Sequence, residues 1–164
     1  MKVGRLARLR SWAALGSLLP LLVAIACGSP GGDAAAERQA IQELLEVYLP
    51  RLAQSYATGD LEPLREFAAE REVATVEKRL LEVAAQGRTL EPELRSVVVE
   101  EVEIWRHSNA YATTLEEWDL RLYAGESRTL LSEVLAQRNR VKYQLKRDEG
   151  RWRVLYRQIE KTFE

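Results

Sequence analysis

The spacing of apolar residues changes once along this 164-residue chain, near Pro92, and that change limits the folds open to it. Before Pro92 apolar residues recur at steps of three and four, which is typical of amphipathic helices. After Pro92 they alternate with polar residues, as in half-buried β-strands. Helices followed by strands predict an α+β domain, in which the helices pack on an antiparallel sheet.

The helical part contains three segments. The first begins near Glu37 and contains Pro50, which predicts a kink or a break near Leu49. A short second helix is expected over residues 61–68, and a third over residues 70–86 with Gly87 as its stop.

Four strands follow, over residues 94–105, 110–123, 128–146 and 151–160. Within the first of them the apolar phase slips across Glu100 and Glu101, which predicts a β-bulge. The residues between the first two strands include His107 and have turn chemistry.

The last two strands form a hairpin with one apolar and one cationic face. Val141, Tyr143 and Leu145 must share a face with Trp152, Val154 and Tyr156, which requires an even loop: Glu149 and Gly150 alone, or residues 147–150. The predicted cationic face comprises Arg138, Arg140, Lys142, Lys146, Arg151, Arg153 and Arg157. It could contact anionic lipid headgroups or an acidic partner, or be a solvated face whose charges meet neighbouring carboxylates.

The N-terminus has the pattern of a signal peptide. Four basic residues precede an uncharged run over residues 11–26, which closes on small residues before Cys27. About 20 apolar residues are needed to cross a membrane, so this run, interrupted by Pro20, is short for an anchor. The alternative to lipidation is a non-lipidated signal peptide with a chance cysteine near the cut.

A cysteine directly after the cut resembles the lipobox of bacterial lipoproteins, although Ala24 stands where leucine is more typical. We therefore expect a signal peptide over residues 1–26, a lipidated Cys27 with a flexible tether over residues 27–36, and the α+β domain over residues 37–164. This implies a lipid-anchored location in the bacterial cell envelope, facing the periplasm or the exterior. Where there are two membranes, Gly28 indicates the outer one.

The charge of the mature chain argues against nucleic-acid binding. Removal of residues 1–26 leaves 20 Lys and Arg against 25 Asp and Glu, whereas nucleic-acid binding needs a basic excess that displaces counterions.

The order of elements is similar to the nuclear transport factor 2-like cone fold, in which a curved sheet wraps around helices and leaves a pocket. Residues 48–61 at the end of the first helix carry this resemblance, together with Tyr143–Leu145 and Gly150–Val154. The helix spacing and residues 111–123 also resemble the accessory domain of plastid-division proteins in that superfamily. The fold hosts many activities, so it does not define a function.

The candidate ligand-binding residues are Glu116, Trp118, Tyr143 and Trp152, which the resemblance places near one another around the pocket. Glu116 shares an alternation phase with Trp118 on the more apolar face of its strand. The large aromatic side chains would line a cavity or simply fill the core.

We expect a non-catalytic domain that binds a protein partner or a small apolar ligand, with no metal and no cofactor. His107, the sole histidine, lies in a turn, and no cluster of zinc ligands or glycine-rich phosphate loop occurs in the sequence. The alternatives are an isomerase- or dehydratase-like enzyme that uses Glu116 or Glu100, and a scaffold element of an envelope complex.

Overall fold

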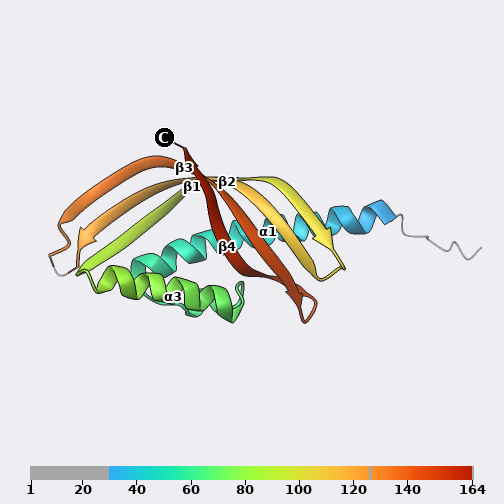
Figure 1. Ribbon diagram of the computed structural model, residues 1–164, viewed down its shortest axis with the longest axis horizontal. Helices are drawn as coiled ribbons and strands as arrows, with labels where there is room; N and C mark the ends of the chain where they lie inside the picture. Colours follow the sequence, from blue (N-terminus) through green and yellow to red (C-terminus); the bar gives the residue numbers. More distant parts are fainter. Residues whose placement is uncertain (1–29, 126, 164) are drawn as a thin grey trace, which may run out of the picture.

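The computed structural model describes residues 30–125 and 127–163 and shows three helices followed by four strands (Figure 1). The strands form one antiparallel sheet in the order β1-β2-β3-β4, which curves over α1 and α3. The elements are α1 (Pro30–Thr58), α2 (Glu62–Arg65), α3 (Glu70–Ala84), β1 (Arg88–Trp105), β2 (Asn109–Ala124), β3 (Leu130–Asp148) and β4 (Arg151–Phe163). The predicted α+β architecture, with helices packed on a curved antiparallel sheet, is confirmed.

Helix α1 is longer than its sequence pattern predicts. It begins at Pro30, so residues 30–36, which we expected in the flexible tether, are helical. Pro50 does not break it, because this residue removes only one backbone hydrogen bond and the acceptor left free belongs to the exposed Glu46. The helix ends where Gly59 adopts a φ of 77° and donates its amide to the Ser55 carbonyl at 2.8 Å.

The predicted signal peptide and Cys27 lie outside the described residues. Within the described residues, no helix combines the length and the apolar character that crossing a bilayer requires.

The segment between α2 and α3 covers part of the β4 edge. Helix α2 is a single turn, shorter than predicted, and buries Leu64 against α1. Val154 then donates its amide to the Phe67 carbonyl at 2.9 Å, and the Ala69 amide donates to the Val154 carbonyl at 2.8 Å. These bonds satisfy backbone groups that an open sheet edge would expose.

A bulge in β1 and the loop between β3 and β4 bear on the sequence predictions. The pairing of β1 with β2 shifts between Val99 and Glu101, which confirms the predicted bulge. Between β3 and β4 the loop is Glu149 and Gly150 alone, with φ values of 48° and 81°. Positive φ at both positions is the geometry of a two-residue hairpin turn, so the even loop is confirmed.

A bulge in β4 reverses which face of the sheet its later side chains point to. Val154 pairs with Leu145 and Tyr156 with Gln144, so Leu155 is an extra residue on β4. Because one extra residue moves the side chains that follow it to the opposite face, Arg157 pairs with the buried Tyr143. The prediction that Arg157 lies on the cationic surface is therefore wrong, because Arg157 lies on the concave face, and Tyr156 is half-buried beside Arg71 of α3 and not in the core.

A bulge in β3 determines which residues of β2 and β3 lie on the concave face of the sheet. Ala136 adopts a φ of 54° and donates its amide to the carboxylate of Asp119 at 2.8 Å. The Arg95 guanidinium also binds this carboxylate, and these contacts lower the pKa of Asp119 to about 2. The bulge pairs Gln137 with Trp118, which places both residues on the concave face beside the helices.

Candidate ligand-binding cavity

Two adjoining cavities lie between the helices and the concave face of the sheet. Their volumes are about 380 Å³ and about 430 Å³, within the range of small-molecule sites. Tyr56, Arg79, Arg157 and Ile159 border both cavities and so form the boundary between them. The first cavity is otherwise lined from α3 and β4 by Glu72, Thr75, Val76, Lys78, Glu82, Tyr156 and Gln158, and the second by Leu52, Val83, Leu90, Pro92, Trp118, Leu120, Gln137 and Asn139.

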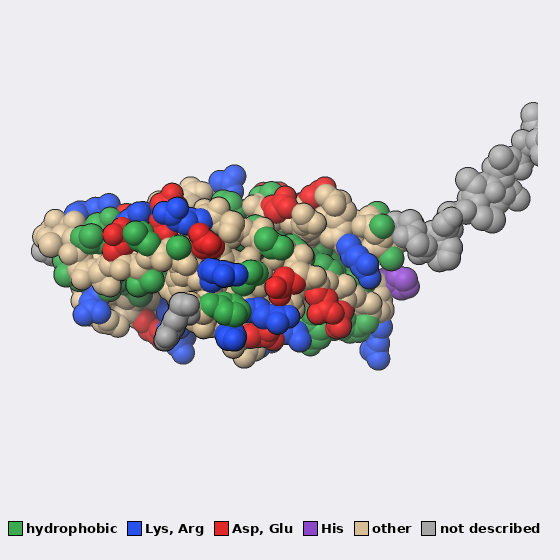
Figure 2. Space-filling model, turned by 90° about the horizontal axis from the view of Figure 1, so that it is seen from above, with side chains coloured by type: hydrophobic (Ala, Val, Ile, Leu, Met, Phe, Trp, Pro, Cys, Tyr) green, Lys and Arg blue, Asp and Glu red, His purple; other side chains and the backbone are tan. Residues whose placement is uncertain are grey.

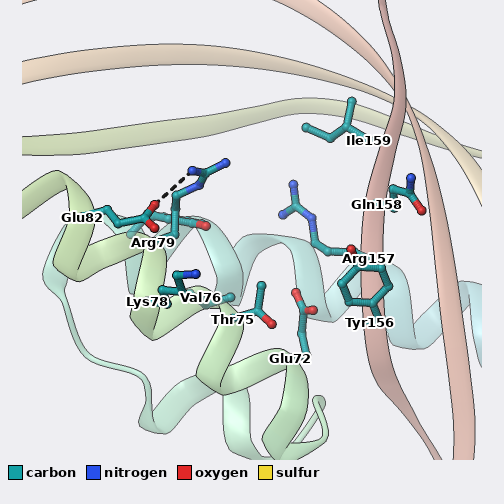
Figure 3. A pocket seen from close by; sticks show the side chains of 11 residues that line it. Glu72, Thr75, Val76, Lys78, Arg79, Glu82, Tyr156, Arg157, Gln158 and Ile159 are labelled. Atoms are coloured by element: carbon teal, nitrogen blue, oxygen red, sulfur yellow. Dashed lines mark hydrogen bonds and ion pairs between the residues drawn. The ribbon is translucent and has the colours of Figure 1, made fainter.

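Arg157 is the central charged residue of this space. Figure 3 shows its side chain leaving β4 and extending into the gap between β4 and α3, above Glu72. Burial lowers the pKa of Arg157, but Tyr143, Tyr48 and Glu116 around it outweigh burial and hold this pKa above its ordinary value. Among the described residues, no carboxylate oxygen lies within 4.0 Å of its guanidinium.

A buried carboxylate whose two oxygens both accept hydrogen bonds lies on β2, two residues before Trp118 at the wall of the second cavity. Glu116 is 1% exposed and accepts hydrogen bonds from Thr114 and from the Trp118 indole, both at 2.8 Å. The Tyr143 hydroxyl donates a third hydrogen bond to Glu116. Both carboxylate oxygens are therefore occupied, and the carboxylate fixes the orientation of Trp118 at the wall of the second cavity.

A second buried carboxylate comes from α3. The Tyr48 hydroxyl donates to Glu72 Oε1 at 2.8 Å, while Glu72 Oε2 has no hydrogen-bond partner among the described residues. Burial raises the pKa of Glu72, although the Tyr48 hydrogen bond and the charge of Arg157 oppose this. The Tyr48 and Tyr143 rings meet edge to face with centroids 6.2 Å apart, so the two carboxylate clusters are in contact.

The structure brings together three of the four predicted ligand-binding residues. Glu116, Trp118 and Tyr143 are joined by hydrogen bonds, and Trp118 borders the second cavity. Trp152 does not join them, because its indole donates to Glu37 Oε2 at 2.6 Å near the start of α1. It lines a separate depression there, so its predicted place beside the other three is wrong.

The predicted basic surface is not one continuous patch. Arg140 pairs with Glu100 at 3.3 Å, Lys142 lies 4.6 Å from the centre of the Tyr111 ring, and Arg151 is exposed. Arg153 is half-buried beside the segment that joins α2 to α3, and Arg157 is half-buried on the concave face. Figure 2, which looks down on the convex side of the sheet, shows Lys and Arg interspersed with Asp and Glu.

The other residues considered for catalysis lie away from the cavities. Glu100 is exposed and ion-paired, and His107 is exposed in the turn between β1 and β2. Sequence reasoning missed Glu72 and Arg157. Glu72 lies four residues before Val76 on the apolar face of α3, a spacing that would have identified it as an acid facing the core. No comparable local signal identifies Arg157, because its position depends on the bulge.

Several solved structures are similar to this chain. The intermembrane space region of the chloroplast protein ARC6 matches with a TM-score of 0.61 and 13% identity, over 74% of this chain and 94% of that one. The protein Rv3472 of Mycobacterium tuberculosis, of unknown function, matches with a TM-score of 0.51 and 15% identity, over 80% of this chain and 75% of that one. A putative scytalone dehydratase from Novosphingobium aromaticivorans matches with a TM-score of 0.49 and 11% identity, over 81% and 90%.

No family model matches the sequence, and no curated protein sequence is significantly similar to it. The structural matches confirm the predicted cone fold, including its similarity to a plastid protein domain. At identities of 13% and 15%, the two matches with TM-scores above 0.5 establish the fold alone.

Proposed function

We propose that this chain, whose fold is the nuclear transport factor 2-like cone, is a non-catalytic domain that binds a small, largely apolar ligand and is held at the bacterial envelope by a lipid on Cys27. The observation that supports ligand binding is the pair of adjoining cavities between the helices and the sheet. The second cavity has mainly apolar walls with a few polar groups, as is typical of sites for small molecules, whereas most side chains that line the first are polar or charged.

The state of the carboxylates supports binding rather than catalysis. Glu116 accepts three hydrogen bonds, and Glu82, which lines the first cavity, is paired with Arg79 at 3.1 Å. Glu72 has one free oxygen, but its neighbours Tyr48 and Arg157 are poor general bases near neutral pH. An acid–base mechanism needs two groups whose pKa values suit opposite roles, and Glu72 has no such counterpart among the described residues at the cavity.

Filling the second cavity should abolish binding. Val83 lines this cavity from α3, whereas the next residue, Ala84, is exposed. A thermal-shift screen of the full chain identifies ligands. We expect Val83→Trp to lower the affinity for each of them by at least about tenfold, or about 1.4 kcal/mol. Ala84→Trp adds an indole to the same helix outside the cavity and should leave the affinities unchanged.

Equal affinities in the two variants would place the ligand elsewhere. A screen without any hit would contradict small-ligand binding and favour a protein partner. Each ligand is also assayed for chemical conversion. Conversion that is lost in Glu116→Gln or Glu72→Gln, with binding retained, would instead establish an enzyme.

Lipidation of Cys27 would hold the domain close to the membrane. Residues 30–36 are helical, so at most two residues separate Cys27 from the described part of α1, and they span at most about 10 Å. The reach of the anchor is therefore about a third of that of the nine-residue tether expected from sequence. A single acyl chain binds membranes only marginally, so stable attachment requires the several chains of a bacterial lipoprotein.

Metabolic labelling tests the anchor directly. Growth with a fatty-acid analogue should label the wild-type protein and leave Cys27→Ser unlabelled, with the variant released from the membrane fraction. Recovery of the mature wild-type protein in soluble form, without any lipid by mass spectrometry, would contradict this part of the proposal.

A further inference from the structure

We infer that the ligand of the cavity is a monocarboxylate with an apolar body, and that its carboxylate binds the guanidinium of Arg157. This inference rests on the proposed ligand-binding function and specifies the ligand's chemistry. It follows from the position of Arg157, from the engagement of the nearby carboxylates, and from the shape of the walls.

The position of Arg157 makes it accessible from both cavities. It borders each of them and extends from β4 into the space beside α3 (Figure 3). Its backbone is held opposite Tyr143 by the β3–β4 pairing beyond the Leu155 bulge. The bulge thus directs a charged side chain toward the concave face, where a bound anion would supply the ion pair that the described residues do not form with it.

The nearest acidic groups do not supply that partner. Both oxygens of Glu116 accept hydrogen bonds from Thr114, Trp118 and Tyr143. Glu72 accepts a hydrogen bond from the Tyr48 hydroxyl, and neither of its oxygens lies within 4.0 Å of the Arg157 guanidinium. An arginine remains charged at every physiological pH, so the donors of Arg157 face the cavity without an ion pair among the described residues.

A carboxylate is the anion that this arrangement fits best. The guanidinium presents two parallel N–H donors that match the two oxygens of one carboxylate. Arg79, the other arginine at the boundary, is paired with Glu82, and Lys78 lines the first cavity alone, so among the described residues Arg157 is the unpaired cation that borders the second cavity. A phosphate would bring up to two negative charges, and the described residues that line the second cavity include no further unpaired Lys or Arg to meet the second one.

The walls determine the remainder of the ligand. Leu52, Leu90, Trp118 and Leu120 surround the second cavity with apolar surface, and its volume of about 430 Å³ exceeds that of the first. The amides of Gln137 and Asn139 add two neutral polar groups. A ligand that places its acid at Arg157 can therefore extend an apolar or aromatic chain along Trp118.

The test uses matched probes on the purified full chain. Isothermal titration calorimetry compares 4-phenylbutyrate with 4-phenylbutanol and 4-phenylbutylamine, which share one apolar body and differ in the head group. We expect the acid to bind about 10- to 100-fold more tightly than the alcohol, as for hydrogen bonds to a charged group. The amine should bind more weakly than the alcohol.

Variants assign the effect to one side chain. Arg157→Met keeps most of the length of the side chain. It should reduce the affinity for the acid to that for the alcohol and leave the affinity for the alcohol unchanged. Arg157→Lys keeps the charge and should recover part of the preference. Arg79→Met, which alters the paired arginine on the same boundary, should change the preference by less than about threefold. A larger loss in Arg79→Met than in Arg157→Met would overturn the assignment.

The head-group comparison also separates this inference from the proposed function. If wild-type protein binds the alcohol as tightly as the acid, and Val83→Trp blocks both, the cavity binds ligands but the carboxylate inference is wrong. The carboxylate inference is also wrong if neither probe binds while the thermal-shift screen yields only ligands without an acid. If nothing binds at all, the proposed function itself fails. The comparison on wild-type protein needs no variant, so it holds even if Arg157→Met does not fold.

Discussion

Replacement of Tyr143 by alanine should lower the free energy of unfolding by about 3–5 kcal/mol, as for large-to-small changes of buried aromatic residues. Tyr143 is 0% exposed, its ring meets Tyr48 edge to face, and its hydroxyl donates to Glu116. Truncation would leave a cavity and also remove one of the three donors that hold the Glu116 carboxylate. Urea denaturation of the full chain, followed by circular dichroism, measures the change.

Tyr143→Phe is the matched control for the hydroxyl. It keeps the ring and its packing but removes the donor, so it should cost about 1–3 kcal/mol, the penalty for a buried polar group that loses its partner. A loss in Tyr143→Phe as large as that in Tyr143→Ala would show that the hydrogen bond, and not the packing, dominates. No loss in Tyr143→Phe would mean that Glu116 does not depend on this donor.

Trp152→Ala should also cost about 3–5 kcal/mol, for a partly different reason. Trp152 is 7% exposed, and its indole donates to Glu37, which also pairs with Arg147. The residue therefore joins the first turns of α1 to the β3–β4 hairpin. Its removal should loosen this end of the domain as well as leave a cavity, and amide hydrogen exchange in residues 37–45 should increase.

Arg151→Ala provides the control for Trp152, because it changes the adjacent side chain on the same strand. Arg151 is exposed, so this substitution should alter the free energy of unfolding by less than about 0.5 kcal/mol. Arg153 is a poorer control, since it is half-buried against the segment that joins α2 to α3. Equal denaturation midpoints for Trp152→Ala and Arg151→Ala would contradict the assigned phase of the hairpin.

The two aromatic residues differ in their relation to the cavities. Trp152 lines neither of them, so Trp152→Ala should reduce stability without changing the preference for an acid over an alcohol. Tyr143 contacts Glu116, which orients Trp118 at the wall of the second cavity. Tyr143→Phe is therefore expected to weaken ligand binding modestly as well.

The sequence by itself determined the features that depend on neighbours in the chain. Alternation over Val141–Leu145 and Trp152–Val154 predicted which faces meet, and the even loop followed from it. The slip at Glu100 and Glu101 predicted the bulge in β1 for the same reason. A period of two or 3.6 residues is a local property, set by the backbone geometry of each element, so it can be recognised without the rest of the molecule.

The tertiary structure alone decided the content of the candidate site. A single extra residue at Leu155 moved Arg157 from the predicted outer face to the cavity, and no residue type at that position indicates the change. Glu72 bonds Tyr48 across 24 residues and Tyr143 bonds Glu116 across 27, contacts that chain spacing does not specify. The cost of burying polar groups is met by partners distant in sequence, and only the packing of helices on the sheet brings those partners together.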